Sequence, residues 1–114
     1  MLEIFGGNTI GMNSEALRQR TKLFALMAIK LMRSLPRNME SAILAKQLVR
    51  STTSLAANYR ATRRARSRAE FISKLSIVVE EIDETVLWLE LIKDSGIHSS
   101  NELNEQLAEA KELL

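Results

Sequence analysis

Five arginines lie within nine residues near the middle of the chain. Guanidinium groups bind phosphate through paired hydrogen bonds, so such a cluster can hold a nucleic-acid backbone, in a complex that salt would weaken. The alternative is that these arginines pair with acids of the segments that follow, within the chain or across a subunit boundary. Both interpretations stay open. The members of the cluster are Arg60, Arg63, Arg64, Arg66 and Arg68.

Few aromatic residues accompany the arginine cluster. Tyr59 and Phe71 lie near it in the sequence, and we expect both to pack in the core rather than to stack on bases. Any nucleic acid would therefore be bound through its backbone and shape, with little readout of base identity.

Acids gather in the segment after the arginine cluster, where Glu81 and Glu84 are one helical turn apart. Helical di-iron proteins place Glu and Glu-x-x-His on paired helices. Here the single histidine, His98, falls in a predicted loop, and no second helix carries matching carboxylates. We expect no metal and no cofactor, and we expect these acids to face water or to pair with arginines.

Catalytic residues are not apparent in the sequence. The chain has no cysteine, and no serine has a histidine in the same framework to activate it. The Gly6-x-x-x-x-Gly11 spacing is followed by Met12-Asn13 instead of Lys and Ser or Thr, so it is not a phosphate-binding loop. We expect no enzymatic activity.

Composition and charge describe one helical domain with two unlike halves. The 114 residues are rich in Leu, Ala, Ile and Met, lack a membrane-spanning run or signal peptide, and are expected to be cytoplasmic. Residues 1–68 hold 13 Lys and Arg against three Asp and Glu, whereas residues 69–114 hold three Lys against 11 acids. Either the halves neutralise each other or the basic half meets a polyanion. We expect internal balance to account for most of these charges.

The first part of the chain is predicted to be an irregular arm followed by a helix. Residues 1–13 hold three of the four glycines, and residues 14–114 are predicted to form the bundle. Ser14 can cap the first helix, which should stop near Ser34 because Pro36 disfavours helix before it. Its apolar face, widened by Leu23 and Met27, consists of Leu17, Phe24, Ala28, Leu31 and Leu35.

Three more helices follow. The second should run from Met39 to Ala61, with a thin stripe of Leu44, Leu48, Ser51, Leu55 and Asn58. The third should begin at Arg68 after a Ser67 cap and stop before Gly96, with a stripe of Phe71, Leu75, Val78, Ile82, Val86 or Thr85, Leu89 and Ile92. Ser99 or Ser100 should cap the fourth, whose stripe is Leu103, Leu107, Ala110 and Leu114. Short connections predict an all-α, antiparallel, up-down-up-down four-helix bundle.

Polar residues on these apolar stripes need hydrogen-bond partners. We expect a buried or inter-subunit polar network that fixes helix register, formed by Arg50, Ser51, Asn58, Glu81 and Glu84. Leu87 and Trp88 widen the apolar arc of the third helix, which suggests a subunit interface. The alternative is that the third helix is central within the monomer.

Six short segments form a set: Arg20-Thr21-Lys22-x-Phe24-Ala25; Val49-Arg50-Ser51-x-x-Ser54-x-x-Ala57-Asn58-Tyr59-Arg60; Arg64-Ala65-Arg66-Ser67; Glu70-Phe71-Ile72-x-Lys74-Leu75; Glu81-x-x-Glu84-Thr85; and Trp88-Leu89-Glu90-Leu91. In order and spacing they resemble the four helix bundle protein family, also described as proteins encoded within intervening sequences of bacterial large-subunit ribosomal RNA. The resemblance spans Leu17 to Gly96. Other branches carry Glu-Gly where this chain has Arg60-Ala61, so this chain is more basic there.

The resemblance implies antiparallel bundles, some of which assemble into rings of five. Some relatives are accessory proteins of diversity-generating retroelements, in which a basic pentameric barrel contacts nucleic acid and a reverse transcriptase. We therefore expect a non-enzymatic homo-oligomer, a pentamer, whose arginine cluster binds RNA or DNA phosphates. The alternative is a structural or adaptor module that binds another protein and has no nucleic-acid role.

Overall fold

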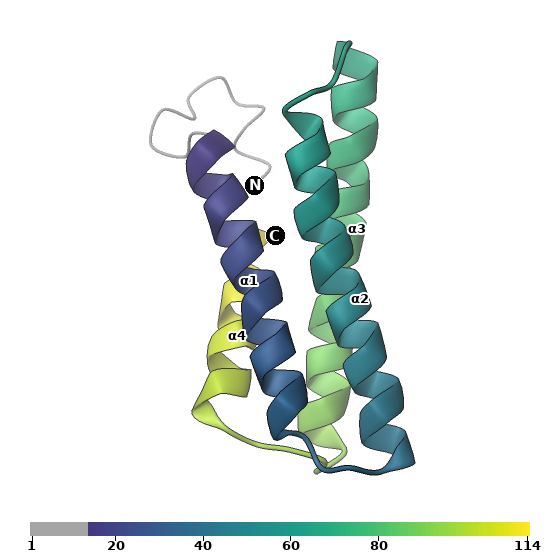
Figure 1. The fold of residues 1–114 in the computed structure, drawn as a ribbon, viewed down its shortest axis with the longest axis vertical. Coiled ribbons are helices and arrows are strands. Elements are labelled where there is room, and N and C mark those ends of the chain that lie inside the picture. The colour runs from purple at the N-terminus through teal and green to yellow at the C-terminus, as the bar shows by residue number, and fades with distance from the viewer. Residues whose placement is uncertain (1–13) are drawn as a thin grey trace.

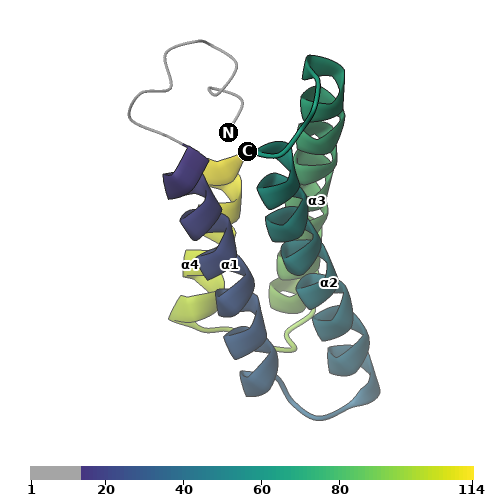
Figure 2. The ribbon, with the colours of Figure 1, turned by 45° about the horizontal axis from the view of Figure 1, so that its top comes forward.

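The computed structural model describes residues 14–114, which form four helices joined by short connections (Figure 1). They are α1 (Ser14–Ser34), α2 (Met39–Thr62), α3 (Arg68–Asp94) and α4 (Asn101–Leu113). Each helix runs opposite to the one before it, and α4 closes the ring by packing on α1 (Figures 1 and 2). The predicted all-α four-helix bundle is confirmed. The arm predicted at residues 1–13 lies outside the described residues.

The ends of the helices follow the local sequence. Ser67 caps α3 and Ser100, the second of two candidate serines, caps α4; each side chain accepts a backbone N–H from three residues on, at 3.1 Å. Gly96 has φ +80° just beyond α3, where a side chain would be strained. The second helix ends at Thr62, one residue beyond the predicted Ala61.

The predicted core face of α1 is confirmed, with one exception. All five residues from Leu17 to Leu35 on that face are buried. Leu23, which was predicted to widen the face, is 58% exposed. It lies about 120° around the helix from Leu17, because each residue turns the chain by about 100°.

The predicted stripe of α2 is partly wrong. Leu48, Ser51 and Leu55 are buried, but Leu44 and Asn58 are only half-buried. Tyr59 is buried, as expected, and the buried face also contains small residues outside the predicted stripe: Ser41, Ala45, Thr52 and Thr62. Such residues let neighbouring helices approach closely.

The stripes of the last two helices are largely confirmed, with one error. Of the two alternatives in α3, Thr85 is fully buried and Val86 packs against the core while partly exposed. In α4, Leu113 is buried whereas the predicted Leu114 is 40% exposed. Gln106 is fully buried, and its side-chain amide donates to the Phe24 carbonyl oxygen at 3.0 Å. This hydrogen bond ties α4 to α1.

The bundle is elongated, with extents of 44 × 23 × 18 Å. The α2–α3 connection, with the arginine cluster, lies at one end of the long axis, and the α1–α2 connection lies at the other (Figure 1). Within residues 14–114, no helix is both long and apolar enough to cross a lipid bilayer.

Candidate nucleic-acid interface

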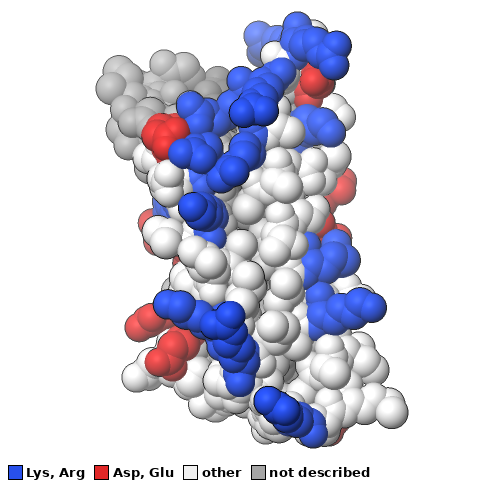
Figure 3. Space-filling model, in the orientation of Figure 1, with Lys and Arg blue, Asp and Glu red and all other residues white. Residues whose placement is uncertain are grey.

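The arginine cluster surrounds the short connection between α2 and α3. Arg60 belongs to the last turn of α2, and Arg68 is the first residue of α3. The connection is tightened by hydrogen bonds from the Arg64 and Ala65 backbone N–H groups to carbonyls near the end of α2, at 3.0 and 3.2 Å. Lysine and arginine side chains consequently gather at this end of the molecule (Figure 3).

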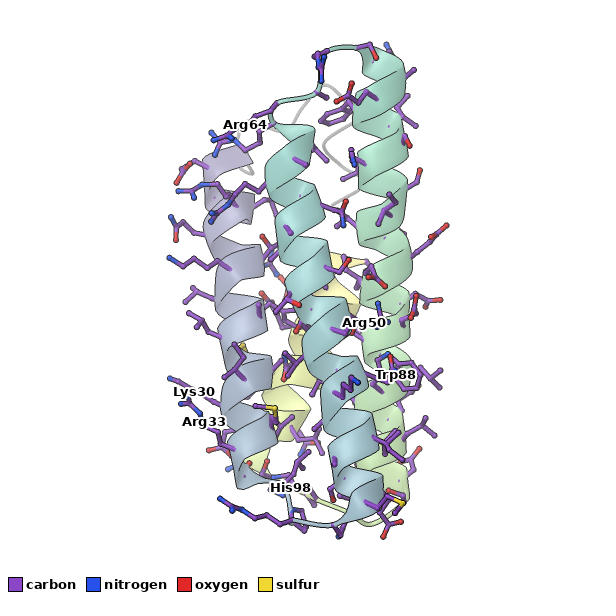
Figure 4. The ribbon with its side chains drawn as sticks, turned by 45° about the vertical axis from the view of Figure 1, so that its right-hand side comes forward. Lys30, Arg33, Arg50, Arg64, Trp88 and His98 are labelled. Carbon is purple, nitrogen blue, oxygen red and sulfur yellow. The ribbon has the colours of Figure 1, made fainter. Side chains whose placement is uncertain are left out.

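Two adjoining depressions lie against this cluster. The first, which we call the upper pocket, has a volume of about 370 Å³ and is lined by Glu15, Arg18, Arg60, Arg63 and Arg64. The second has a volume of about 410 Å³, and Arg60 and Arg64 line it as well, together with Arg66 and the acid Glu70. Arg64 points from the α2 end toward the α1 side of the bundle (Figure 4). The upper pocket therefore lies at the α1–α2 seam, and the second depression lies where the end of α2 meets the start of α3.

One carboxylate, Glu15, occupies the rim of the upper pocket. It accepts hydrogen bonds from Arg18 at 2.6 and 3.0 Å and from Arg63 at 2.8 Å. Hydrogen bonds from Arg18, Gln19 and Arg63 lower the pKa of Glu15 from 4.5 to about 2. Within one chain, the acid that pairs with the cluster thus comes from α1, whereas the pairing alternative drawn from the sequence placed it on the third or fourth helix.

The other four members of the cluster are exposed, and none of them forms an ion pair with any residue between 14 and 114. These are Arg60, Arg64, Arg66 and Arg68. Ion pairing is also incomplete for the basic half of the chain, residues 1–68, as a whole. Of its 13 Lys and Arg, all of which fall in the described part of the chain, only Arg18, Arg20, Arg50 and Arg63 form ion pairs there. Direct ion pairs within the described chain therefore account for four of these 13 charges.

The predicted polar network lies between α2 and α3 of one chain. Arg50 contacts Glu81 at 3.1 Å and Glu84 at 2.7 Å, with Glu81 buried and Arg50 near the surface (Figure 4). Beside them, the Ser51 hydroxyl lies 2.7 Å from the Thr85 hydroxyl, which donates to the Glu81 carbonyl oxygen at 2.8 Å. Thr85 therefore completes a link that joins the ion pairs to the core.

Asn58 does not contact this network. Its amide nitrogen donates to the carbonyl and hydroxyl oxygens of Ser54 at 2.9 and 3.2 Å, within the same helix. Asn58 lies two helical turns beyond Ser51 and turns back onto its own helix, so within one chain it stays apart from the Arg50, Glu81 and Glu84 contacts. Thr85 was detectable in the sequence as the residue one turn after Glu81.

Between residues 14 and 114, no group of three His, Cys, Asp or Glu side chains is placed to hold a metal ion. His98 Nε2 lies 3.0 Å from the Ser100 hydroxyl, which is already engaged as the cap of α4. This arrangement holds the α3–α4 connection against the start of α4.

Comparison with known proteins supports the family suggested by the residues. The sequence matches the profile of the family described as 23S rRNA-intervening sequence protein over residues 15–114. No curated protein is similar enough to count as a match.

A similar solved structure is the crystal structure of a protein with unknown function from the S23 ribosomal protein family of Bacteroides thetaiotaomicron. It is 30% identical and has a TM-score of 0.81, over 90% of this chain and 91% of that chain. The chain therefore belongs to the 23S rRNA-intervening sequence protein family.

Proposed function

We propose that this protein is a non-enzymatic, homo-oligomeric helical bundle whose arginine cluster binds RNA or DNA through backbone phosphates in the cytoplasm. The observation that carries the proposal is the set of four exposed arginines with which no carboxylate of residues 14–114 forms an ion pair. Two of them, Arg60 and Arg64, line both depressions, so several guanidinium groups converge on one concave surface. Phosphate is the ligand that this geometry suits best.

The charge distribution in the folded molecule supports the same proposal. Residues 14–62 form α1, α2 and their connection, and they carry nine Lys and Arg against two acids. Residues 68–114 carry four Lys and Arg against 11 acids. Because α1 packs on α2 and α3 packs on α4, the split in sequence becomes a split between two sides of the bundle. A polyanion is attracted to one side and repelled by the other.

Exposed apolar side chains support self-association. Leu87 and Leu91 of α3 are 47% and 40% exposed, and Ile43 of α2 is 57% exposed. The indole Nε1 of Trp88, between α2 and α3 in Figure 4, is buried with no hydrogen-bond partner in the described structure. Small domains gain stability by burying such surface against copies of themselves. A ring of five, as the family resemblance implies, is the assembly that we propose.

The same apolar surface favours the second candidate, an adaptor that binds another protein and no nucleic acid. The two candidates differ in their response to salt. Phosphate binding by n arginines should fall with a slope of about −0.9n in a plot of log affinity against log salt concentration. An apolar protein contact should be nearly independent of salt.

The decisive experiment replaces Arg60, Arg64 and Arg66 together with glutamine and measures binding of labelled RNA and DNA by fluorescence anisotropy. We expect the salt slope to become shallower by about 2.7, because three phosphate contacts are removed. The matched control neutralises Lys74, Lys93 and Lys111, which lie on α3 and α4 and remove the same charge. Equal affinity of the two triple variants, with unchanged helix content by circular dichroism, would eliminate the nucleic-acid role.

Oligomerisation has its own test. Light scattering coupled to gel filtration should give the mass of a pentamer, and Leu87→Glu with Leu91→Glu should reduce that mass by placing charges in the interface. A monomeric wild-type protein would contradict the assembly while leaving the arginine test intact.

A further inference from the structure

A second basic depression lies at the opposite end of the α1–α2 seam. This depression, which we call the lower groove, has a volume of about 820 Å³ and is lined by residues from the end of α1, the α1–α2 connection and the first half of α2. Its charged residues are Arg33, Arg37 and Lys46, and no acid lines it. None of these three cations forms an ion pair with a residue of the described chain.

The wall of the lower groove also contains an unsatisfied hydroxyl. Ser41 is only 1% exposed, and its Oγ has no hydrogen-bond partner within the described structure. Native proteins leave few buried polar groups without a partner. A ligand that offers hydrogen-bonding oxygens therefore suits this groove better than a purely apolar one.

The lower groove and the upper pocket open on the same face of the molecule. Figure 3 shows positively charged side chains at both ends of this face, with a mostly uncharged strip between them. On α2, helical spacing places the neutral residues Thr53 and Ala56 between Lys46 and Arg60. A polyanion that reaches both ends must consequently lie lengthwise along the seam.

The distance between the two basic sites sets the length of that polyanion. Lys46 and Arg60 are 14 residues apart on α2. At about 1.5 Å per residue this separation is roughly 21 Å, which corresponds to about six base pairs at 3.4 Å each. The full 44 Å length of the bundle corresponds to about 13 base pairs.

The seam lacks the aromatic side chains with which proteins grip single strands. In the described part of the chain, Phe24 and Tyr59 are buried, and Phe71 and Trp88 of α3 are packed against the core. Single-strand binders usually stack successive bases on aromatic rings. A surface with separated cations and no stacking platform instead matches the regularly spaced phosphates of a double helix.

We propose that the α1–α2 seam binds double-helical nucleic acid lengthwise, with phosphates held at the upper pocket and again at the lower groove. This inference rests on the proposed function and adds the substrate class and a second set of contacts. Both contacts are to backbone phosphates, which RNA and DNA duplexes share. The experiment therefore includes duplexes of both kinds.

The test uses the full chain and labelled hairpins of RNA and of DNA, with stems of about five and about 14 base pairs, and single strands of matched length. The variant Arg37→Gln with Lys46→Gln should make the salt slope shallower by about 1.8 for the long stems, because two phosphate contacts are lost. It should leave the short stems nearly unaffected, because they reach only one end of the seam. Lys46→Gln alone should produce about half of the effect.

The matched control is Lys93→Gln with Lys111→Gln, which removes the same charge from the α3–α4 side. Long stems of either nucleic acid that bind more tightly than short stems and single strands support the proposal. Single strands that bind as tightly as long stems, or a lower-groove variant that behaves like the control, would overturn it. If duplex binding along the seam is overturned in this way but the triple variant of Arg60, Arg64 and Arg66 still loses nucleic-acid binding, the proposed function stands. If the triple variant keeps its nucleic-acid binding, both proposals fail.

Discussion

Replacing Glu15 with glutamine should strengthen nucleic-acid binding, which distinguishes this change from ordinary loss-of-charge variants. Glu15 is the one carboxylate that lines the upper pocket, and it engages Arg18 and Arg63. Phosphates must compete with it for both guanidinium groups. Removing its charge frees these two cations and also removes a negative charge that repels the ligand.

The expected change in the salt slope follows from the number of guanidinium groups that Glu15→Gln frees. Each additional phosphate contact should steepen the salt slope by about 0.9, so Glu15→Gln should add between about 0.9 and about 1.8. Over a fourfold change in salt, one such contact alters affinity by roughly 3.5-fold. The control is Glu80→Gln, which removes the same charge from an exposed position on α3.

The pH dependence of this effect is fixed by the lowered pKa. Because hydrogen bonds from Arg18, Gln19 and Arg63 hold the pKa of Glu15 near 2, its carboxylate stays charged at pH 4. The ion pairs are therefore fully present above pH 4.5 and are lost as the pH falls toward 2. The advantage of Glu15→Gln over wild type should persist from pH 7 to pH 4.

Fluorescence anisotropy with a labelled duplex, repeated at several salt concentrations, measures both the affinity and the slope. Thermal denaturation checks that the first turn of α1, to which Glu15 belongs, remains folded. If Glu15→Gln and Glu80→Gln bind equally, phosphates do not contact the upper pocket, and the assignment of its arginines fails.

Three further predictions concern stability and are measured by chemical or thermal denaturation. Ser51→Ala and Thr85→Val should each lower the free energy of unfolding by about 1 kcal/mol, and the double variant should cost less than their sum, because both remove one buried hydrogen bond at 2.7 Å. Additive costs would contradict this coupling. Gln106→Leu should be neutral or stabilising by up to about 1 kcal/mol, because the buried side-chain oxygen has no partner in the described structure and its removal offsets the lost hydrogen bond. Glu109→Gln should cost up to about 1 kcal/mol by weakening the two contacts with Arg20, at 2.8 and 2.9 Å, and the cost should shrink in about 1 M salt.

The sequence was most informative where single residues decide the local backbone. Pro36 ends α1, the Ser67 cap begins α3, and Gly96 follows the end of α3, as predicted. Apolar spacing also identified the core face of α1, because its residues are large and regularly spaced. These features depend on neighbours within one or two helical turns, so no tertiary information is needed.

The face of α2 was harder to predict because tertiary packing, and not hydrophobicity, decides what is buried there. Ser41, Thr52 and Thr62 have low exposure although none is apolar. These residues are buried because neighbouring helices approach closely there. The Thr52 hydroxyl donates a hydrogen bond to the Leu48 carbonyl oxygen of its own helix, at 3.0 Å. A hydroxyl that hydrogen-bonds to a backbone carbonyl of its own helix can be buried, and a hydrophobic pattern in the sequence does not reveal it.

The candidate interface shows the same limit. The arginine cluster is visible in the sequence because its members lie within nine residues, but its carboxylate partner, Glu15, is 48 residues from Arg63. The lower groove is less visible still, since Arg33, Arg37 and Lys46 are dispersed over two helices and a connection. Only the turn between α1 and α2 brings them together.

The direct ion pairs between the two sides of the bundle explain why a basic face remains. Arg20 joins α1 to Glu109 and Glu112, and Arg50 joins α2 to Glu81 and Glu84. Each of these arginines takes two carboxylates, so four acids are engaged by only two cations. Only these two cations of α1 and α2 reach carboxylates of α3 and α4, so the other lysines and arginines of α1 and α2 have no ion pair across the described bundle. An approximately neutral chain thus acquires a strongly basic face through the way in which its helices pair.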